Sequence, residues 1–392
     1  MPEAPLRIAI LGSTGSIGCQ TLDVVARLRA SGRAIDVVAL AAGSNIDLLA
    51  EQIDAFGPSV ASIGTPEAAE RLRRQFPDLT IYGGNEGPRT IPGVDGVDLV
   101  VNALVGSVGL PPTIEALSAG RSVALANKES LVVGGDLVRE ALDLHGGHLF
   151  PVDSEHSGLL QCLEAGRCED VARVTLTASG GPFLRTSIPD LKAVTPEQAL
   201  AHPNWSMGSR ITIDSATMVN KAFEVIEAHV LFDLDYERIS VVVHPESIVH
   251  AMVEFRDGST IAQLASHDMR VPIQYALTYP ERIGTDLPRL SFDEARGLHF
   301  EPLDEERFPA FGVVLDAARA GGTAPAAVNA ADEVLVARFL RGEIPFTGIA
   351  HGLRAVLDRW ERERTGVPPS LDVLVATDRW ARAIASEISP AV

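Results

Sequence analysis

The sequence predicts an α/β protein with an N-terminal doubly wound parallel sheet, a central α+β domain and a C-terminal helical bundle. Three observations support this prediction. Short apolar segments alternate with polar-faced helical stretches from Leu6 to Asp153, a glycine-rich turn follows the first segment, and helix-start signals recur after residue 302. Alternating strands and helices build a parallel sheet because each crossover helix returns the chain to the end from which the next strand starts.

Six apolar segments are the expected strands of the N-terminal sheet. Each is short, apolar and bounded by turn residues, as is usual for parallel strands buried on both faces. They are Ile8–Leu11, Val37–Ala41, Val60–Ile63, Leu99–Ala103, Ser122–Ala126 and His148–Val152. The sequence therefore predicts a Rossmann-like domain over residues 1–150.

The pattern changes after residue 150. Val171–Thr177 and Ile239–Val243 are expected strands. Ile248–Phe255 and Thr260–Leu264 are expected to form a hairpin around Asp257-Gly258, because Asp-Gly is a strong hairpin signal. These segments predict an α+β domain over residues 151–285, followed by a proline-rich linker over residues 286–304.

Helix-start signals dominate the rest of the chain. They occur at Thr323, which is followed by Pro325, at Pro345 and at Pro369-Ser370, since proline is favoured in the first turn of a helix. The alanine-rich segment from 317 to 331 is predicted as helix and not as linker, because alanine has the highest helix propensity. The sequence thus predicts a helical domain over residues 305–392, which we interpret as structural support.

Composition excludes several classes of protein. Hydrophobic residues make up 46% and charged residues 22% of the chain, which is typical of folded domains. The 33 basic and 52 acidic residues give a net charge of -19, which disfavours nucleic-acid and anionic-membrane partners. The same field repels phosphorylated ligands, so a phosphate site must be built locally from N–H groups, hydroxyls, amides and one or two cations.

The cysteines and the N-terminus indicate a cytoplasmic protein. Cys19, Cys162 and Cys168 form neither an even set nor a Cys-x-x-Cys pair, which suits a reducing compartment. The first expected strand begins close to Met1, which leaves no room for a signal peptide, and no apolar stretch is long enough to span a bilayer.

The glycine-rich turn from Gly12 to Gly18 lies between the first expected strand and a helix. In this setting the backbone can approach a pyrophosphate at a helix N-terminus, although a tightly packed strand-helix corner is the alternative. An NAD site would place an acidic residue at the end of the second strand, whereas this chain has Gly43-Ser44-Asn45 there. Ser44 and Asn45 could donate to a 2′-phosphate, so the sequence favours NADP.

Three carboxylates are candidate metal ligands. Asp153 and Glu155 follow an expected strand, and i, i+2 residues of extended backbone point the same way. Glu224 lies with Asn220 and Lys221 in an expected helix from Ser215 to His229. An oxygen-only set suits Mg²⁺ or Mn²⁺, but from spacing alone a solvated acidic face is the more ordinary interpretation.

Further polar motifs each allow a functional and a structural interpretation. Ser179-Gly180-Gly181 could form an anion site with Ser215, Asn220 and Lys221, or an ordinary turn. The segment 202–208 has the composition of a closing lid, although a tryptophan such as Trp205 is more often core. Asn127-Lys128-Glu129 follows a strand at the ligand-binding edge of the sheet, or Lys128 forms a surface pair. His244 and His250 are interpreted as structural residues.

Six motifs together resemble the 1-deoxy-D-xylulose 5-phosphate reductoisomerase family, and the likeness covers essentially the whole chain. They are residues 12–18, 126–130, 151–156, 178–183, 202–208 and 218–224. The resemblance implies an enzyme of the non-mevalonate isoprenoid pathway that rearranges the substrate and reduces the product with NADPH, giving 2-C-methyl-D-erythritol 4-phosphate. It also implies a divalent metal, Mg²⁺ or Mn²⁺, and a homodimer whose contact lies in the sheet of the second domain.

The resemblance also implies a role for individual residues. The implied catalytic residues are Lys128, Asp153, Glu155, Glu224 and His202, and the implied metal ligands are Asp153, Glu155 and Glu224. The implied substrate-binding residues are Lys128, Ser154, Glu155, Ser179, His202, Trp205, Ser215, Asn220, Lys221 and Glu224. The implied cofactor-binding residues are Gly12, Thr14, Gly15, Ser16, Ile17, Gly43, Ser44, Asn45, Asn127, Glu129 and Gly208.

Some members of the family carry a basic residue at the position of Ser44. This difference affects how the chain would discriminate between NADPH and NADH.

Two alternative functions remain open from the sequence. One is another NADP-dependent dehydrogenase, which would need a nucleophilic cysteine or a histidine near the nicotinamide. The other is a dinucleotide-binding sensor without catalysis.

Overall fold

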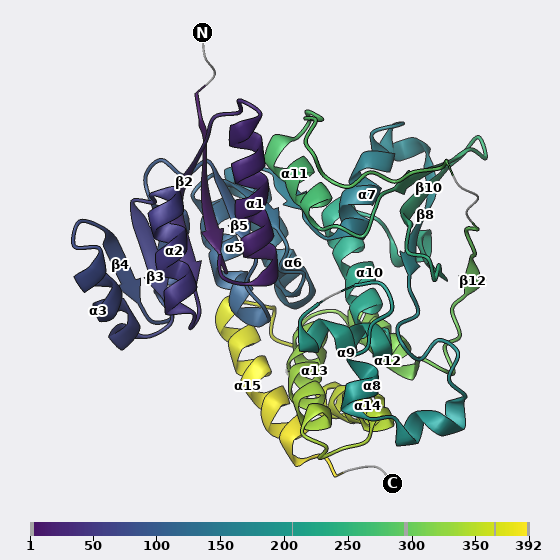
Figure 1. Ribbon diagram of the computed structural model, residues 1–392. Coiled ribbons are helices and arrows are strands. Elements are labelled where there is room, and N and C mark those ends of the chain that lie inside the picture. The colour runs from purple at the N-terminus through teal and green to yellow at the C-terminus, as the bar shows by residue number, and fades with distance from the viewer. Residues whose placement is uncertain (1–3, 206, 294–296, 364–365, 390–392) are drawn as a thin grey trace. The chain divides into compact units, whose positions relative to one another are not determined.

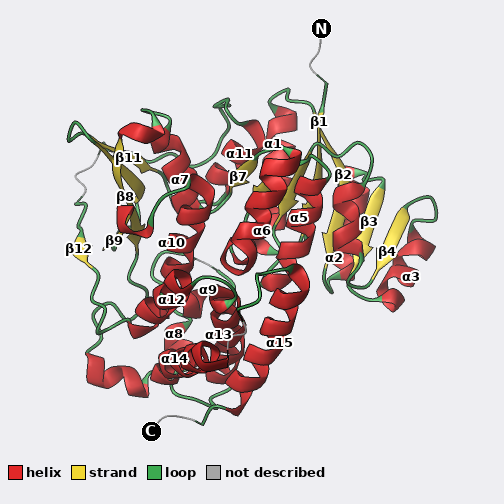
Figure 2. Cartoon of the chain, turned by 180° about the vertical axis from the view of Figure 1, so that it is seen from behind, coloured by secondary structure: helices red, strands yellow, loops and turns green. Residues whose placement is uncertain are grey.

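The computed structural model describes residues 4–205, 207–293, 297–363 and 366–389 (Figures 1 and 2). The chain divides into two compact units. The first contains Met1–Ser130, Val138–Ser157 and Asp268–Pro288, and the second contains Leu131–Leu137, Gly158–His267 and Arg289–Val392. The division into three consecutive domains stays a prediction. In the two compact units, residues 151–157 and 268–285 belong to the unit that contains the first sheet.

A parallel sheet forms the centre of the first unit. Its strands are β1 (Leu6–Leu11), β2 (Ile35–Ala42), β3 (Val60–Ile63), β4 (Thr80–Gly83), β5 (Leu99–Asn102), β6 (Ser122–Leu125) and β7 (Leu149–Pro151). They lie in the order β4-β3-β2-β1-β5-β6-β7, so the strand order reverses between β1 and β5. This confirms the predicted doubly wound sheet, with β4 as an edge strand that the sequence analysis did not predict.

Helices pack against this sheet because the strands are apolar on both faces. The helices that begin in this unit are α1 (Ser16–Ala30), α2 (Ile46–Phe56), α3 (Pro66–Gln75), α4 (Gly87–Thr90), α5 (Leu110–Ser118), α6 (Glu129–His145), α7 (Ser154–Leu163) and α11 (Arg270–Thr278). Helices α1 and α11 lie side by side (Figure 1). Ile8, Ile10, Leu40 and Val101 are fully buried, and each such side chain stabilises the fold by about 1.5–3 kcal/mol.

The second unit contains a mixed sheet. Its strands are β8 (Val171–Ala178), β9 (Ile239–Val243), β10 (Val249–Phe255), β11 (Thr260–Leu264) and β12 (Glu301–Pro302), in the order β11-β10-β8-β9-β12. Strands β10 and β11 pair antiparallel, which confirms the predicted hairpin. Its turn uses Gly258 at φ +86°, while Asp257 accepts a hydrogen bond from the Ser259 N–H at 2.9 Å.

Helices complete the second unit. They are α8 (Pro196–Ala199), α9 (Ser209–Thr217), α10 (Val219–Phe232), α12 (Pro309–Ala320), α13 (Ala324–Leu340), α14 (Phe346–Glu363) and α15 (Leu371–Glu387). The predicted starts are confirmed, with Thr323 as the N-cap of α13 and Ser370 as the N-cap of α15. One core joins the sheet to these helices, since Val174, Phe223, Phe311 and Ala381 belong to the same buried cluster.

Two predicted helices are corrected by the structure. Residues 317–331 do not form one helix, because Gly321 and Gly322 adopt φ values of +66° and +58° and separate α12 from α13. The predicted helix from Ser215 to His229 is also interrupted. Met218 takes a left-handed conformation at φ +64°, which costs about 1–2 kcal/mol for a residue other than glycine, and Ser215 therefore lies on α9 while Lys221 and Glu224 lie on α10.

Among the residues that the structure describes, no helix combines the length and the hydropathy that crossing a bilayer requires.

Candidate active site

The turn after β1 is tight, and its glycines are required by sterics. Gly12 adopts φ +86°, and a Cβ there would lie 2.5 Å from the Ala103 carbonyl oxygen. A Cβ on Gly18 would lie 2.2 Å from the Gly12 carbonyl oxygen. The N–H groups of Gly12 and Ser13 both donate to the Ala41 carbonyl oxygen at 2.8 Å, which ties this turn to the end of β2.

The same turn presents a helix N-terminus to solvent. Gly15 is the N-cap of α1 and offers no side chain to satisfy the first N–H groups of the helix. Gly15 and Ser16 are exposed, and the first turn of α1 carries no acidic residue. The turn is therefore a packed corner with an exposed helix N-terminus beside it, which is compatible with both interpretations left open by the sequence.

Gly43, Ser44 and Asn45 follow β2 and are exposed. A Cβ on Gly43 would meet no atom within 4 Å, so space is open beside the backbone there. The Asn45 side-chain oxygen caps α2 by accepting from the Leu48 N–H at 3.2 Å. Because the cap uses that oxygen, the Asn45 side-chain NH2 is the group that could donate to an acceptor such as a phosphate.

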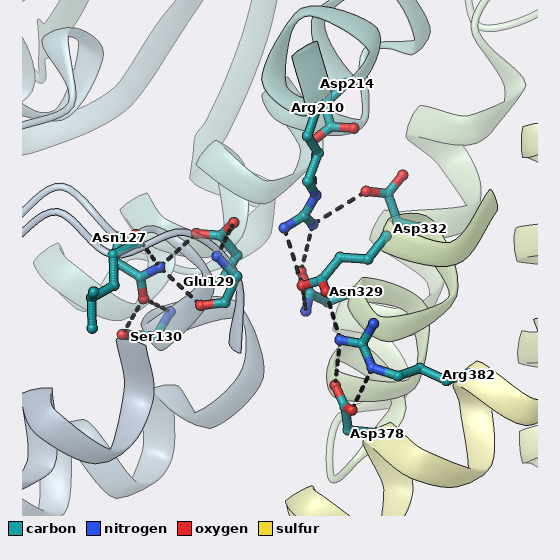
Figure 3. Close-up of polar contacts among 12 residues, drawn as sticks. Asn127, Glu129, Ser130, Arg210, Asp214, Asn329, Asp332, Asp378 and Arg382 are labelled. Carbon is teal, nitrogen blue, oxygen red and sulfur yellow. Dashed lines mark hydrogen bonds and ion pairs between the residues drawn. The ribbon is translucent and has the colours of Figure 1, made fainter. Parts of the chain in front are cut away.

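Asn127 is buried beside the end of β6, and its side chain hydrogen-bonds to several neighbouring residues (Figure 3). Its amide nitrogen donates to the Leu104 and Gly106 carbonyl oxygens at 2.9 and 3.0 Å and to a Glu129 carboxylate oxygen at 2.9 Å. Its amide oxygen accepts from the Ser130 N–H and hydroxyl at 3.1 and 2.5 Å. The side chain of Asn127 is thus engaged within the protein, as are its N–H, which donates to the Asn102 carbonyl oxygen at 3.1 Å, and its carbonyl oxygen, which accepts from the Ser130 N–H at 3.2 Å.

Asp153 and Glu155 are brought together by a helix start and not by a strand. Helix α7 begins at Ser154, and Asp153 precedes it with its carbonyl oxygen accepting from the Ser157 N–H at 2.8 Å. An Asp153 carboxylate oxygen accepts from the Glu155 N–H at 3.2 Å, while the Ser154 hydroxyl donates to Glu155. The predicted extended geometry is therefore wrong, because the chain turns into α7 directly after β7.

Lys128 holds Asp153 in its ionised form. Lys128 is only 7% exposed, and its Nζ lies 2.7 Å from an Asp153 carboxylate oxygen. The His156 ring, which is fully buried, lies 3.3 Å from the other oxygen. Burial alone would raise the pKa of Asp153, but the Lys128 charge and the contact with His156 outweigh it and hold that pKa well below its usual range. The surface-pair interpretation of Lys128 is therefore wrong.

Replacing Lys128 by Met is expected to make protein stability depend on pH. In the wild type the stability from ionised Asp153 is present above pH 3.8 and is lost only as the pH falls through its lowered pKa. Without Lys128, burial raises the pKa of Asp153, so the destabilisation grows as the pH rises through that raised value. We expect the loss in unfolding free energy to be at least about 1 kcal/mol larger at pH 8 than at pH 5.

Urea unfolding of both proteins at the two pH values measures this difference. Lys192→Met is the matched control, since Lys192 is exposed in the short 3₁₀ helix Ile188–Ala193. An equal loss at pH 5 and pH 8 would contradict the proposed charge coupling.

His202 organises a cluster of hydroxyls in the second unit. Its Nδ1 accepts from the N–H groups of Asn204 and Trp205 at 3.2 and 3.0 Å, which places the ring proton on Nε2. Nε2 lies 3.2 Å from the Ser179 hydroxyl and 3.1 Å from the Ser215 hydroxyl. Burial, followed by the charge of His267, lowers the pKa of His202 and keeps the ring neutral.

This tautomer fixes the direction of the two hydroxyl protons. Because Nε2 donates, the oxygens of Ser179 and Ser215 act as acceptors toward it. The Ser179 oxygen also accepts from the Gly181 N–H at 3.1 Å. Both hydroxyl protons are therefore available for an anion.

Helix α10 supplies a buried cation and a carboxylate. Lys221 is 4% exposed and Glu224 is 2% exposed, and the two form an ion pair. The Asn220 amide donates to Glu224 at 2.5 Å. One turn of helix thus aligns these three side chains, as their i, i+3 and i, i+4 spacing predicts.

Trp205 lies outside the apolar core. It is half-buried, and its ring contacts His267 edge-on with centroids 5.4 Å apart and His250 at 6.3 Å. Gly208, at the end of the same segment, is the exposed N-cap of α9. The core interpretation of Trp205 is therefore wrong, and residues 202–205 and 207–208, the described part of the segment 202–208, form a loop as predicted.

Two features of the sequence point to the buried lysines and to His156. The chain has three lysines, Lys128, Lys192 and Lys221, and the first and last are buried against carboxylates, which is rare for lysine outside functional sites. His156 was not assigned, although its i, i+3 spacing from Asp153 brings it to that carboxylate once α7 is a helix. His244 is structural as predicted, since its Nδ1 donates to the His299 carbonyl oxygen at 2.8 Å.

Comparison with known proteins identifies the family. Three family models match in succession: 1-deoxy-D-xylulose 5-phosphate reductoisomerase over residues 8–135, its C-terminal domain over residues 149–232, and the DXP reductoisomerase C-terminal domain over residues 264–384. The 1-deoxy-D-xylulose 5-phosphate reductoisomerase of Chlorobium phaeovibrioides is 50% identical over 382 residues, covering 97% of this chain and 98% of that protein. The chain belongs to the 1-deoxy-D-xylulose 5-phosphate reductoisomerase family.

Other members of the family agree in sequence and in structure. The reductoisomerase of Thermomicrobium roseum is 49% identical over 384 residues, which cover 98% of this chain and 97% of that protein. The solved structure of the 1-deoxy-D-xylulose 5-phosphate reductoisomerase from Zymomonas mobilis in complex with NADPH is 40% identical and has a TM-score of 0.90, covering 97% of this chain and 98% of that chain. A DOX-P reductoisomerase structure with NADPH, fosmidomycin and magnesium is 39% identical, also with a TM-score of 0.90 and 97% of each chain covered.

Proposed function

We propose that this chain converts 1-deoxy-D-xylulose 5-phosphate to 2-C-methyl-D-erythritol 4-phosphate with NADPH and a divalent metal, a step of isoprenoid precursor synthesis. The observation that carries the proposal is 50% identity to a reductoisomerase over 97% of the chain. The proposal also accounts for the buried cations and carboxylates in the polar clusters of both units. Charged side chains are rarely buried, and those that are buried occur often at functional sites.

The substrate phosphate is bound by donors of the second unit. Ser179 and Ser215 have hydroxyl protons to donate, because His202 is fixed as an Nε2 donor. The Asn220 amide and the Lys221 ammonium complete the set. A net charge of -19 repels the substrate at long range, and this local group of neutral donors and one cation is the kind of site that can overcome it.

Asp153, Glu155 and Glu224 are the proposed metal ligands. Their side chains fit a hard cation, since all donors are carboxylate oxygens and the lowered pKa of Asp153 keeps that group ionised at neutral pH. The metal, Mg²⁺ or Mn²⁺, would polarise the ketone and the adjacent hydroxyl and lower the cost of the oxyanion that carbon rearrangement requires.

The protein residues around these ligands orient the reacting groups. Lys128 offers ammonium protons to the substrate oxygens while it keeps Asp153 ionised. The Ser154 hydroxyl and the Glu155 carboxylate bind the hydroxy-ketone. His202 and Trp205 belong to the segment that covers the bound substrate and excludes water during hydride transfer.

NADPH binds to the first unit. The turn residues Gly12, Thr14, Gly15, Ser16 and Ile17 contact the pyrophosphate at the start of α1, where the helix N-terminus favours negative charge. Gly43, Ser44 and Asn45 contact the adenosine ribose and its 2′-phosphate, where the open space beside Gly43 accommodates the sugar. The remaining proposed contacts come from Asn127 and Glu129 of the first unit, and Gly208 of the second unit is a further proposed contact.

NADPH consumption by the purified protein tests the function. We expect consumption with 1-deoxy-D-xylulose 5-phosphate and Mg²⁺ or Mn²⁺, its loss on addition of a chelator, and a much lower rate with NADH. Consumption that resists chelation would favour a different NADP-dependent dehydrogenase. Absence of consumption by folded protein that binds NADPH would favour a dinucleotide-binding sensor.

Ser44→Asp is expected to change the cofactor preference. A carboxylate at the end of β2 repels the 2′-phosphate and accepts from a ribose hydroxyl, so we expect the KM for NADPH to rise at least about tenfold while that for NADH falls. Ser44→Ala is the control for loss of the hydroxyl alone. Steady-state kinetics with both cofactors measures the change, and an unaltered NADPH-to-NADH ratio would remove Ser44 from the proposed 2′-phosphate contact.

We also propose a cytoplasmic homodimer. Cys19, Cys162 and Cys168 are free, in agreement with a reducing compartment. The sheet of the second unit ends in β11, whose residues 260–262 are exposed along an edge strand, and such edges pair readily with a second copy. Light scattering of the protein after size-exclusion chromatography tests for the dimer mass.

A further inference from the structure

A polar network links three helices of the second unit, and Arg210 lies at one end of it (Figure 3). Arg210 is the second residue of α9, the helix that follows the segment 202–208 and carries Ser215. Its guanidinium donates to Asn329 at 2.9 Å and to Glu333 at 3.1 Å, and it pairs with Asp332 at 3.2 Å. All three partners lie on α13.

The network continues to the last helix. Glu333 also pairs with Arg382 at 2.6 Å, and Arg382 pairs with Asp378 at 2.6 Å. Both of these residues lie on α15. A chain of alternating charges therefore runs from α9 through α13 to α15, and Glu333 is the member shared by both arginines.

The centre of the network is buried and held by several polar contacts. Asp332 is fully buried, and Arg210 also lies 3.5 Å from Asp214 on its own helix. Burial, followed by the opposing charge of Arg210, sets the pKa of Asp332 at about 6, and a hydrogen bond with Asp214 contributes. Arg210 therefore contacts two buried carboxyl groups, that of Asp214 on its own helix and that of Asp332 on α13.

The orientation of α9 depends on this network as well as on apolar packing. The helix has nine residues, and its buried members include Thr212, Asp214 and Thr217 as well as Ile213 and Ala216. It starts at Gly208, which has no side chain, and ends at Met218 with a left-handed backbone. A small rotation of α9 about its axis would displace the Ser215 hydroxyl, and with it the Nε2 of His202.

We propose that Arg210 is a positioning residue for the substrate phosphate, and that α13 and α15 hold α9 through Glu333 and Arg382 in the orientation that Ser215 and His202 require. This inference rests on the proposed function, because the phosphate site belongs to it. It assigns to the C-terminal helices a role in substrate binding in addition to structural support.

Two substitutions test the proposal from opposite ends of the network. Arg210→Lys keeps the charge but cannot bond Asn329, Asp332 and Glu333 together, because an ammonium lacks the planar fork of a guanidinium. Arg382→Gln removes the support of Glu333 at a residue that contacts no proposed substrate-binding residue in the described structure. We expect the KM for 1-deoxy-D-xylulose 5-phosphate to rise about tenfold in Arg210→Lys and about threefold in Arg382→Gln. In both variants kcat and the KM for NADPH are expected to stay nearly unchanged.

Arg354→Gln is the matched control. It removes an arginine-carboxylate pair between two other helices of the second unit, with Arg354 on α14 and Asp316 on α12, 2.5 Å apart. Its KM values are expected to equal those of the wild type. The double variant Arg210→Lys with Arg382→Gln should weaken substrate binding by less than the product of the single effects, because both act through Glu333.

Calorimetric titration with inorganic phosphate supplies a readout independent of turnover, and thermal unfolding identifies variants that fail to fold. Weaker phosphate binding by Arg382→Gln, with unchanged NADPH binding, supports the proposal even if Arg210→Lys is unstable. Folded variants with unchanged KM and phosphate affinity overturn it, as does an equal rise in Arg354→Gln. A wild type that binds phosphate but does not consume NADPH would refute the proposed function and leave the phosphate titrations to decide this inference.

Discussion

Glu224→Gln is expected to lower metal-dependent kcat at least about a thousandfold and to leave NADPH binding intact. The amide removes one of three proposed anionic ligands, and a neutral oxygen is a weaker ligand for a hard divalent cation. The Asn220 amide can still donate to the side-chain oxygen of the introduced glutamine, so the local hydrogen bond survives while the charge is lost. Steady-state rates across a range of Mn²⁺ concentrations measure the effect.

The substitution also removes the ion pair between Lys221 and Glu224, so its effect on folding must be separated from its effect on metal binding. Thermal unfolding and NADPH titration of the variant provide that separation. Glu254→Gln is a control of the same chemistry in the same unit, where the carboxylate pairs with Arg173 on the sheet. A near-normal rate in folded Glu224→Gln would falsify the assignment of Glu224 as a metal ligand.

Lys221→Met is expected to raise the KM for 1-deoxy-D-xylulose 5-phosphate about 30- to 200-fold. Lys221 is the cation among the proposed phosphate donors, and a charge-assisted hydrogen bond to a buried anion contributes about 2–3 kcal/mol. Methionine keeps most of the length of the buried stem, so the change removes the charge with little loss of packing. Substrate KM, NADPH KM and kcat are measured together.

Lys192→Met is the control for this variant, because Lys192 is the exposed lysine of the same unit. The two variants change the net charge equally, so general repulsion of the substrate would raise both KM values to the same extent. A selective rise in Lys221→Met assigns the effect to the phosphate site. An unchanged substrate KM would remove Lys221 from that site, whatever the effect on kcat.

Local backbone rules allowed much of the fold to be predicted. The hairpin around Asp257-Gly258 and the N-caps Thr323 and Ser370 were predicted because turn and cap geometry depend on neighbouring residues. The doubly wound sheet was predicted because apolar strands alternated with amphipathic helices. The candidate site residues came from the resemblance, since spacing alone favoured a solvated acidic face.

Local rules failed where packing overrides propensity. Residues 317–331 are rich in alanine, yet Gly321 and Gly322 divide them between α12 and α13. Met218 adopts a left-handed backbone that no residue preference predicts, and it places Ser215 and Lys221 on different helices. Asp153 and Glu155 were expected on extended backbone, but the chain turns into α7 directly after β7.

The sequence by itself determined the succession of strands and helices, the glycines of the first turn and the identity of the motif residues, because these depend on short-range sterics and on chemistry carried by single side chains. Only the tertiary structure decided the ionised state of Asp153, the tautomer of His202 and the network of Arg210. Each depends on charges and donors brought together by folding: Lys128 lies 25 residues before Asp153, and Asn329 lies 119 residues after Arg210. Long-range contacts of this kind follow from packing and desolvation, which no local pattern records.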